Sequence, residues 1–154
     1  VLSTNTYQKG GWVLNMLRHK LGDNTFWEGI RRYYETYRNS NALTDDFWHV
    51  MEKVSGQDLE AFFQQWLFTK GHPQLKWNWE YKKGKVIVQL EQLQEHHVFQ
   101  FPLEIGLVKD GQTTVETIEM KERSQSFEIK TKDRPDSVVL DPNQWTLFQD
   151  MGTP

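Results

Sequence analysis

The period of the hydrophobic pattern changes at Gly71-His72-Pro73, and this change constrains the fold more than any other feature of the chain. Before it, apolar side chains recur every three or four residues, as on one face of a helix. After it, apolar and polar side chains alternate, as on a strand with one buried face. A helical hydrophobic period does not suit a strand, and an alternating pattern does not suit a helix. The sequence therefore predicts an α+β fold, with a helical bundle over residues 1–71 and a small antiparallel β-sandwich over residues 72–154.

Four helices with short connections are predicted in the first part, which implies two packed helical hairpins. Each has an apolar stripe at helical spacing and residues suited to its ends, such as Gly22 and Gly56. In order, the predicted helices begin near Gly11, after a cap at Asp23 or Asn24, after a cap at Thr44, and near Asp58, and the last ends at Gly71.

About six or seven short strands are predicted in the second part. Lys83-Gly84 and Asp110-Gly111 are tight-turn pairs that suit hairpins between neighbouring strands. The alternating segments are residues 75–81, 86–90, 99–107, 115 onward, 127–129 and 138–140. Asp141-Pro142-Asn143 ends the last clear strand, and the apolar residues after it are expected to cover the sandwich edge: Trp145, Leu147 and Phe148.

Composition excludes several classes of protein. With 14% aromatic residues the chain is too apolar for disorder, and 154 residues can bury roughly two-thirds of their surface on folding. The net charge of -3 and the absence of a long basic run argue against nucleic acid or an anionic membrane as the main partner. The lack of cysteine excludes disulfides, thiol nucleophiles and cysteine-based metal sites. The cellular compartment stays open.

A tyrosine lies just before a glycine pair in Tyr7-Gln8-Lys9-Gly10-Gly11. A phenol with a pKa of about 10 stays protonated at neutral pH, so Tyr7 can donate a hydrogen bond to an oxyanion without losing its proton. The two glycines allow backbone and substrate to approach closely. On these residues alone, a packed or capping tyrosine is the simpler interpretation.

The segments that follow extend this pattern. In order, the chain contains Met16-Leu17-Arg18, Leu21-Gly22-Asp23, Thr44-Asp45-Asp46-Phe47, Ser55-Gly56-Gln57-Asp58-Leu59, Phe62-Phe63-Gln64-Gln65-Trp66-Leu67 and Gly71-His72-Pro73. Together with the tyrosine segment, they resemble the aminopeptidase N family of zinc metallopeptidases in both order and spacing. The second part resembles, through less specific motifs, the β-sandwich domain that follows the catalytic domain in that family.

The resemblance implies part of a zinc-dependent aminopeptidase that removes N-terminal residues from peptides. In that family an H-E-x-x-H helix and a further Glu hold zinc, the motif Glu is the general base, and a tyrosine corresponding to Tyr7 stabilises the tetrahedral intermediate. Zinc is therefore the expected cofactor of the full-length enzyme and a peptide its substrate. The upstream catalytic lobe of the same chain is the expected partner of these helices.

The zinc motif and the family's G-x-M-E-N segment, which holds the substrate amino group, are both absent from the sequence. The chain also starts at Val1 without a signal-peptide pattern, and no apolar run is long enough to span a membrane. We therefore expect an excised piece that comprises the C-terminal helical part of a thermolysin-like catalytic domain and the β-sandwich domain. This piece is expected to bind no zinc and to be inactive alone.

Two groups of ligand-like side chains have simpler explanations than a metal site. His49 and Glu52 lie at i and i+3 and could share a ligand face, but a solvated pair on a charged helix is expected. Glu95-His96-His97 could hold a metal in a loop, but a turn with exposed imidazoles is expected.

Three further features have structural interpretations. Asp45 and Asp46 mark the first turn of a helix rather than a catalytic carboxylate pair. Trp77 and Trp79 face one side of a strand and could stack on a sugar, but as large apolar side chains they are expected in the core. Lys9 is expected to be exposed or paired, with no assigned role.

A non-catalytic module is the alternative function. A helical bundle and a β-sandwich could present an aromatic surface to a peptide or sugar, which would explain the absent zinc motif without truncation. Self-association is a further possibility, because helices that cover a catalytic lobe would leave an apolar face exposed in the isolated piece.

Overall fold

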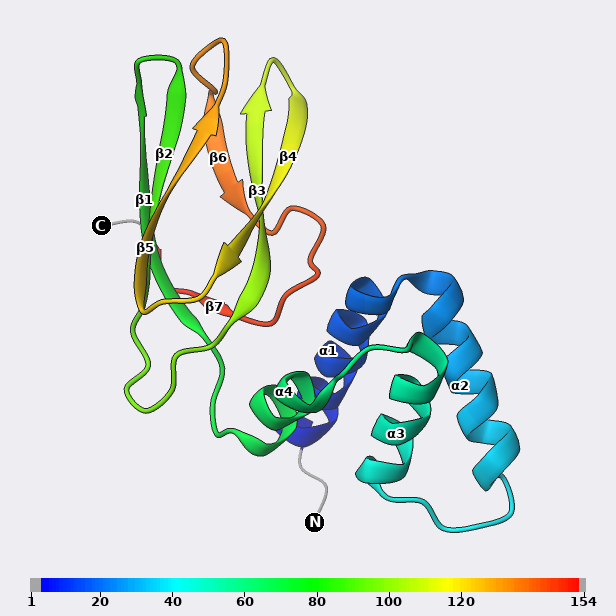
Figure 1. Cartoon of the computed structure of the whole chain (residues 1–154). Helices are drawn as coiled ribbons and strands as arrows, with labels where there is room; N and C mark the ends of the chain where they lie inside the picture. The colour runs from blue at the N-terminus through cyan, green and yellow to red at the C-terminus, as the bar shows by residue number, and fades with distance from the viewer. Residues whose placement is uncertain (1–3, 153–154) are drawn as a thin grey trace. The chain divides into compact units, whose positions relative to one another are not determined.

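The computed structural model describes the backbone of residues 4–152 and the side chains of residues 7–152. The chain divides into two compact units, Val1–Lys70 and Gly71–Pro154. The first unit is helical and the second is built of strands (Figure 1). The predicted α+β class, with helices first and a β-sandwich second, is confirmed.

Within its described residues, the helical unit consists of four helices and a π-helical turn. In chain order they are α1 (Thr4–Leu21), α2 (Asp23–Tyr37), α3 (Thr44–Ser55), α4 (Glu60–Phe63) and the π-helix η1 (Gln64–Phe68), which directly continues α4. Gly56 ends α3 in the left-handed conformation, which glycine adopts without steric cost.

Buried apolar side chains from all the longer helices form the core of this unit. Gly29 of α2 lies against Met51 of α3, and a Cβ at Gly29 would lie 2.2 Å from the Met51 sulfur. Glycine is therefore what lets these two helices approach so closely. The core residues are Leu17, Leu21, Phe26, Met51, Leu59 and Phe63.

The first helix starts earlier than the sequence predicts. It begins at Thr4 rather than near Gly11, so Tyr7 and both glycines lie within it. Glycine costs a helix interior only about 1 kcal/mol relative to alanine, so a glycine pair does not by itself end a helix.

The caps of α2 and α3 also differ from the prediction. Neither Asp23 nor Asn24 caps α2, whose N-cap is Gly22, without a side-chain bond. Thr44 is the first residue of α3, and its N-cap is Leu43. The Leu43 N–H donates to the Asp46 carboxylate at 2.8 Å, so an acid in the first turn satisfies this end of the helix.

The fourth helix is shorter than predicted and changes its winding. Asp58 accepts the backbone N–H of Glu60 at 2.9 Å, just before α4 begins. The helix widens to π geometry at Gln64 and ends at Phe68, three residues before Gly71. It ends there because Thr69 turns to extended backbone, and the Thr69 hydroxyl donates to the Gln64 carbonyl at 3.0 Å.

As far as residue 152, where the described part of the second unit ends, seven strands make up two sheets. They are β1 (Gln74–Lys82), β2 (Lys85–Gln92), β3 (Phe101–Lys109), β4 (Gln112–Met120), β5 (Ser124–Lys130), β6 (Ser137–Leu140) and β7 (Gln149–Asp150). The larger sheet has the order β5-β2-β1-β7 and the smaller one β4-β3-β6. All pairings are antiparallel except β1 with β7, which is parallel.

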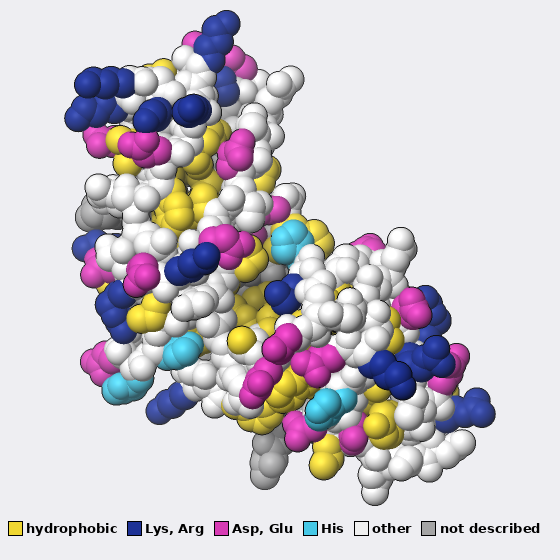
Figure 2. All heavy atoms as spheres, in the orientation of Figure 1, with side chains coloured by type: hydrophobic (Ala, Val, Ile, Leu, Met, Phe, Trp, Pro, Cys, Tyr) yellow, Lys and Arg dark blue, Asp and Glu magenta, His cyan; other side chains and the backbone are white. Residues whose placement is uncertain are grey.

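The alternation predicted from the sequence sets the two faces of the larger sheet. One face carries the buried apolar residues of β1 and β2, among them Leu75, Val86, Val88 and Leu90. The other face is polar and ends in a row of three lysines, because Lys82 pairs with Lys85 and Lys85 with Lys130. In Figure 2 basic side chains gather at the end of this unit that carries the β1–β2 hairpin.

A buried glutamine holds the chain between β2 and β3. The Gln92 side chain is 1% exposed, and its Nε2 donates to the Phe99 carbonyl while its Oε1 accepts the Phe99 N–H. Arg123 donates to the carbonyls of Gln92 and Glu95, at the start of this connection. The connection is therefore held by side-chain bonds from Gln92 and from Arg123, together with a backbone bond from the Leu93 N–H to the Gln74 carbonyl of β1.

In the part of the chain that the structure describes, each helix is too short or too polar to cross a membrane.

Candidate functional site

Tyr7 lies in the second turn of α1 and points away from the core of its unit. The side chain is 79% exposed, so the packed tyrosine that the residues alone suggest is not what the structure shows. The hydroxyl is free of packing that would keep a substrate away. Tyr7 is therefore accessible for a hydrogen bond to a group outside the helical unit.

The face of α1 that carries Tyr7 is open over more than one turn. Gly11 and Leu14 lie four and seven residues after Tyr7, on the same side of the helix. A Cβ added at Gly10 or Gly11 would meet no atom within 4 Å, and Leu14 is also exposed. This open face combines a phenol, two glycines and a leucine.

Lys9 lies on the opposite side of the same helix and is tied to η1. Its Nζ donates to the carbonyl of Thr69 at 3.2 Å, across 60 residues of sequence. Partial burial lowers the pKa of the Lys9 ammonium. Sequence patterns do not predict this bond, because no local pattern links two residues so far apart.

Arg18 and Asp23 close the corner between α1 and α2. The guanidinium donates from Nε and one terminal nitrogen to the two carboxylate oxygens, both at 2.8 Å. This bond lowers the pKa of Asp23 and raises that of Arg18. The Arg18 side chain also lies over the Trp27 ring, 5.7 Å from its centroid.

The pair His49 and Glu52 is engaged in the fold rather than poised for a metal. The His49 Nδ1 lies 2.6 Å from the Asp45 carbonyl and therefore donates to it. The Glu52 carboxylate accepts the backbone N–H of Leu59 at 2.9 Å, which helps to start α4. The acids Asp45 and Asp46 lie in the first turn of α3, as predicted.

The side chains of the turn Glu95-His96-His97 do not form a metal site either. Glu95 and His96 are both highly exposed, with 3.6 Å between carboxylate and imidazole, and the His97 ring packs edge-on against Phe99. Among the residues described, there is no group of three or more His, Cys, Asp or Glu side chains that could hold a metal ion. The residues present therefore do not fit a zinc site.

The two tryptophans of β1 do not form a stacking platform. Trp77 is only 9% exposed, and its indole nitrogen donates to the Asp150 carboxylate at 3.1 Å. Trp79 is half-buried, and the Arg134 guanidinium lies 5.9 Å from its ring centroid. Both are structural parts of the β unit.

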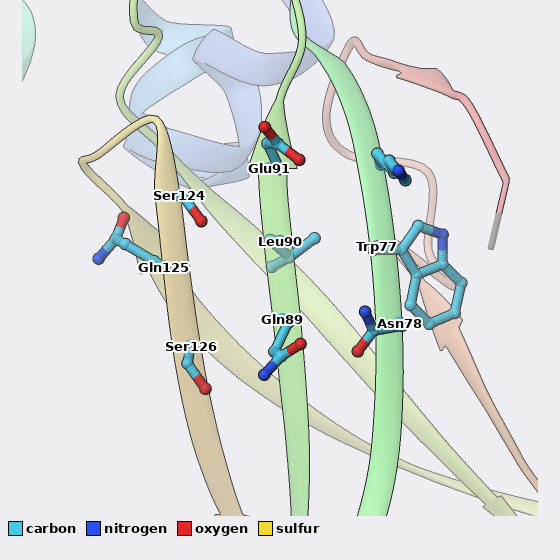
Figure 3. A pocket seen from close by; sticks show the side chains of 9 residues that line it. Trp77, Asn78, Gln89, Leu90, Glu91, Ser124, Gln125 and Ser126 are labelled. Carbon is cyan, nitrogen blue, oxygen red and sulfur yellow. The ribbon is translucent and has the colours of Figure 1, made fainter. Parts of the chain in front are cut away.

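A shallow hollow of about 520 Å³ lies along β1, β2 and β5 (Figure 3). Asn78, Gln89 and Ser126 form one row across these strands, and Glu91 and Ser124 lie in the next row. Within the described chain, the side chains of Asn78, Gln89 and Ser126 have no hydrogen-bond partner. The hollow offers amides and hydroxyls but no exposed aromatic ring on which a sugar could stack.

Comparison with known proteins finds matches to the helical unit. Residues 1–66 match the model of the peptidase family M1 domain. Aminopeptidase N of Lactococcus lactis subsp. lactis is 35% identical over 71 residues, which is 46% of this chain and 8% of that protein. The resemblance to aminopeptidase N proteins found in the sequence is confirmed.

Two further matches extend into the β unit. The alanine/arginine aminopeptidase of Saccharomyces cerevisiae is 28% identical over 134 residues, which is 83% of this chain and 15% of that protein. The crystal structure of Legionella pneumophila aminopeptidase A in complex with aspartic acid matches 97% of this chain and 18% of that chain, with a TM-score of 0.78 and 16% identity. The structural match shows a shared fold. The chain spans 15% or less of the two sequence relatives.

Proposed function

We propose that this chain is part of a zinc-dependent aminopeptidase, because residues 1–66 match the model of the peptidase family M1 domain. It comprises the C-terminal helical part of the catalytic domain, over residues 1–71, and the β-sandwich domain, over residues 72–154. Its substrate is the N-terminal residue of a peptide. The upstream catalytic lobe of the same polypeptide is its partner, and the family match is the observation that carries the proposal.

Tyr7 is the residue of this chain that takes part in the reaction. Attack on a peptide carbonyl places negative charge on its oxygen, and a hydrogen-bond donor aimed at that oxygen lowers the barrier. A neutral phenol donates this bond without transferring its proton. The exposure of Tyr7 and the openness of the helix face around Gly11 support this role.

Zinc and its ligands belong to the part of the enzyme outside these residues. The described residues do not supply a ligand set, so this chain contributes neither the metal nor the general base. The 154 residues alone are therefore inactive, and the β-sandwich braces the helices that carry Tyr7.

The alternative, a peptide- or sugar-binding module, is supported less well. Its best site is the hollow on the larger sheet, which is shallow and has no exposed aromatic ring in its lining. Trp77, which the sequence offered as a platform, is buried. The family match, by contrast, covers the segment that contains Tyr7.

Replacing Tyr7 by phenylalanine in the full-length protein tests the proposal. Tyr7→Phe keeps the ring and removes the donor, so kcat should fall by about 10²–10³-fold while KM changes little. Tyr34→Phe is the matched control, because Tyr34 is also exposed, at 67%, on α2. Steady-state kinetics on aminoacyl-nitroanilides measures both variants. A Tyr7→Phe enzyme with the kcat of the wild type would remove Tyr7 from the reaction.

A further inference from the structure

Lys9 continues the buried face of α1 toward its N-terminus. Val13 and Met16 follow it by four and seven residues, and both are buried. The aliphatic stem of Lys9 extends the same face, and its ammonium ends on the Thr69 carbonyl, just after η1. The helix and the π-helix are in direct contact. The bond therefore joins the first turns of α1 to the end of the helical unit.

Two features of its sequence make the N-terminal part of α1 a weak helix. The first turn carries no acidic residue to complement the helix dipole. Gly10 and Gly11 follow directly, and each makes the helix less favourable than alanine would. A bond from a charged donor to a carbonyl at a helix C-terminus offsets such a loss, because the carbonyls there have no partner within the helix. The bond from Lys9 thus holds a stretch that its own sequence leaves weak.

The same bond fixes the direction of Tyr7. Successive residues of an α-helix turn by about 100°, so Tyr7 and Lys9 project about 200° apart, on opposite sides of α1. The bond from Lys9 to Thr69 holds this part of α1 in place, so Tyr7 stays on the open face. Rotation or fraying of this turn would move the phenol by more than the tolerance of a catalytic hydrogen bond.

We propose that Lys9 is a positioning residue for Tyr7, acting through its bond to the Thr69 carbonyl. This inference rests on the proposed function, in which the Tyr7 hydroxyl stabilises the oxyanion. Under this inference, replacing Lys9 lowers kcat and leaves substrate binding unchanged.

Single substitutions in the full-length protein provide the first test. Lys9→Met keeps most of the stem and removes the donor, so kcat should fall by about 10–100-fold with KM nearly unchanged. Lys9→Arg retains a charged donor and should recover most of the loss. Lys20→Met, at the exposed end of the same helix, should leave both parameters as in the wild type. Wild-type kcat in Lys9→Met would overturn the inference.

A double substitution separates positioning from general stabilisation. If Lys9 acts only through Tyr7, adding Lys9→Met to Tyr7→Phe should lower kcat no further. Two losses that multiply would contradict the inference, because Lys9 would then act independently of the phenol. The inference is also contradicted if Lys9→Met does not fold and Lys9→Arg does not recover kcat.

The two proposals fail in different ways. A Tyr7→Phe enzyme as fast as the wild type overturns the proposed function together with the role of Lys9. A slow Tyr7→Phe enzyme beside a fast Lys9→Met enzyme overturns the role of Lys9 alone.

Discussion

The helical and β units fold by different kinds of constraint. The helical unit depends on contacts that only a particular type of residue can make. Gly29 packs against Met51 because it has no side chain, and the Asp46 carboxylate accepts the N–H of Leu43. The β unit depends mainly on alternation, in which many apolar residues can fill an inward position. A contact of the first kind requires a particular residue at a particular position. An alternation requires only that the residue at each inward position be apolar. The family match covers residues 1–66, within the helical unit.

Gln92 is a buried polar residue of the β unit whose contacts depend on its residue type, and its replacement has the largest expected effect on stability. Gln92→Leu would remove the two bonds from Gln92 to the buried N–H and carbonyl of Phe99, and losing such a bond to a buried polar group costs about 1–3 kcal/mol. We expect a loss of roughly 3 kcal/mol in urea-induced unfolding of this chain. The control Gln89→Leu, on the polar face of the same strand, should change stability by less than about 0.5 kcal/mol. A small effect at Gln92 would mean that alternation alone specifies the β unit.

Gly29 tests the corresponding claim for the helical unit. In Gly29→Ala the new methyl group meets the Met51 sulfur, and overpacking a filled core costs about 1–3 kcal/mol. This exceeds the roughly 1 kcal/mol that alanine gains in helix propensity, so the variant should be less stable. Gly11→Ala, where the methyl group meets nothing, should be more stable by up to about 1 kcal/mol. Thermal unfolding followed by circular dichroism measures both, and equal effects would argue against a specific contact at Gly29.

The ion pair between Arg18 and Asp23 gives the smallest effect, visible in the pH dependence of stability. Because the bond lowers the pKa of Asp23 in the folded chain, its contribution is complete above the ordinary aspartate pKa of about 3.9. That contribution is lost as the pH falls through the lower pKa of the folded state. Asp23→Asn should therefore flatten the acid side of the stability profile.

The matched control is Glu28→Gln, which removes an exposed carboxylate from the same helix. Urea unfolding between about pH 6 and pH 2 compares the two variants with the wild type. If both variants lose stability at low pH as steeply as the wild type, the pair does not stabilise the corner between α1 and α2.

Much of the fold follows from the sequence because it rests on local patterns. The change of period at Gly71 and the turn pairs Lys83-Gly84 and Asp110-Gly111 indicate the order of elements and the hairpins. The early start of α1 does not follow from local pattern, because a glycine pair inside a helix looks like a helix end. The buried position of Gln92 could be read from its place after Val88 and Leu90 in the alternation, although its partner could not.

The site is predictable only in part. Tyr7 is recognisable because it belongs to a motif, while its exposure on an open helix face is a property of the fold. The bond from Lys9 to Thr69 joins residues 60 apart, and local patterns carry no information on such a pair. Candidates such as His49 and Glu52 look like ligands in sequence, yet each has a hydrogen-bond partner in the backbone.

The most direct test of the account is to measure zinc content and hydrolysis of aminoacyl-nitroanilides for the full-length protein and for this chain, side by side. The account predicts that the full-length protein holds zinc and cleaves, while the 154 residues alone do neither. A full-length protein without zinc and without activity would contradict it and favour a binding module. Zinc-dependent cleavage by the 154 residues alone would contradict the assignment of the metal and the base to the rest of the enzyme.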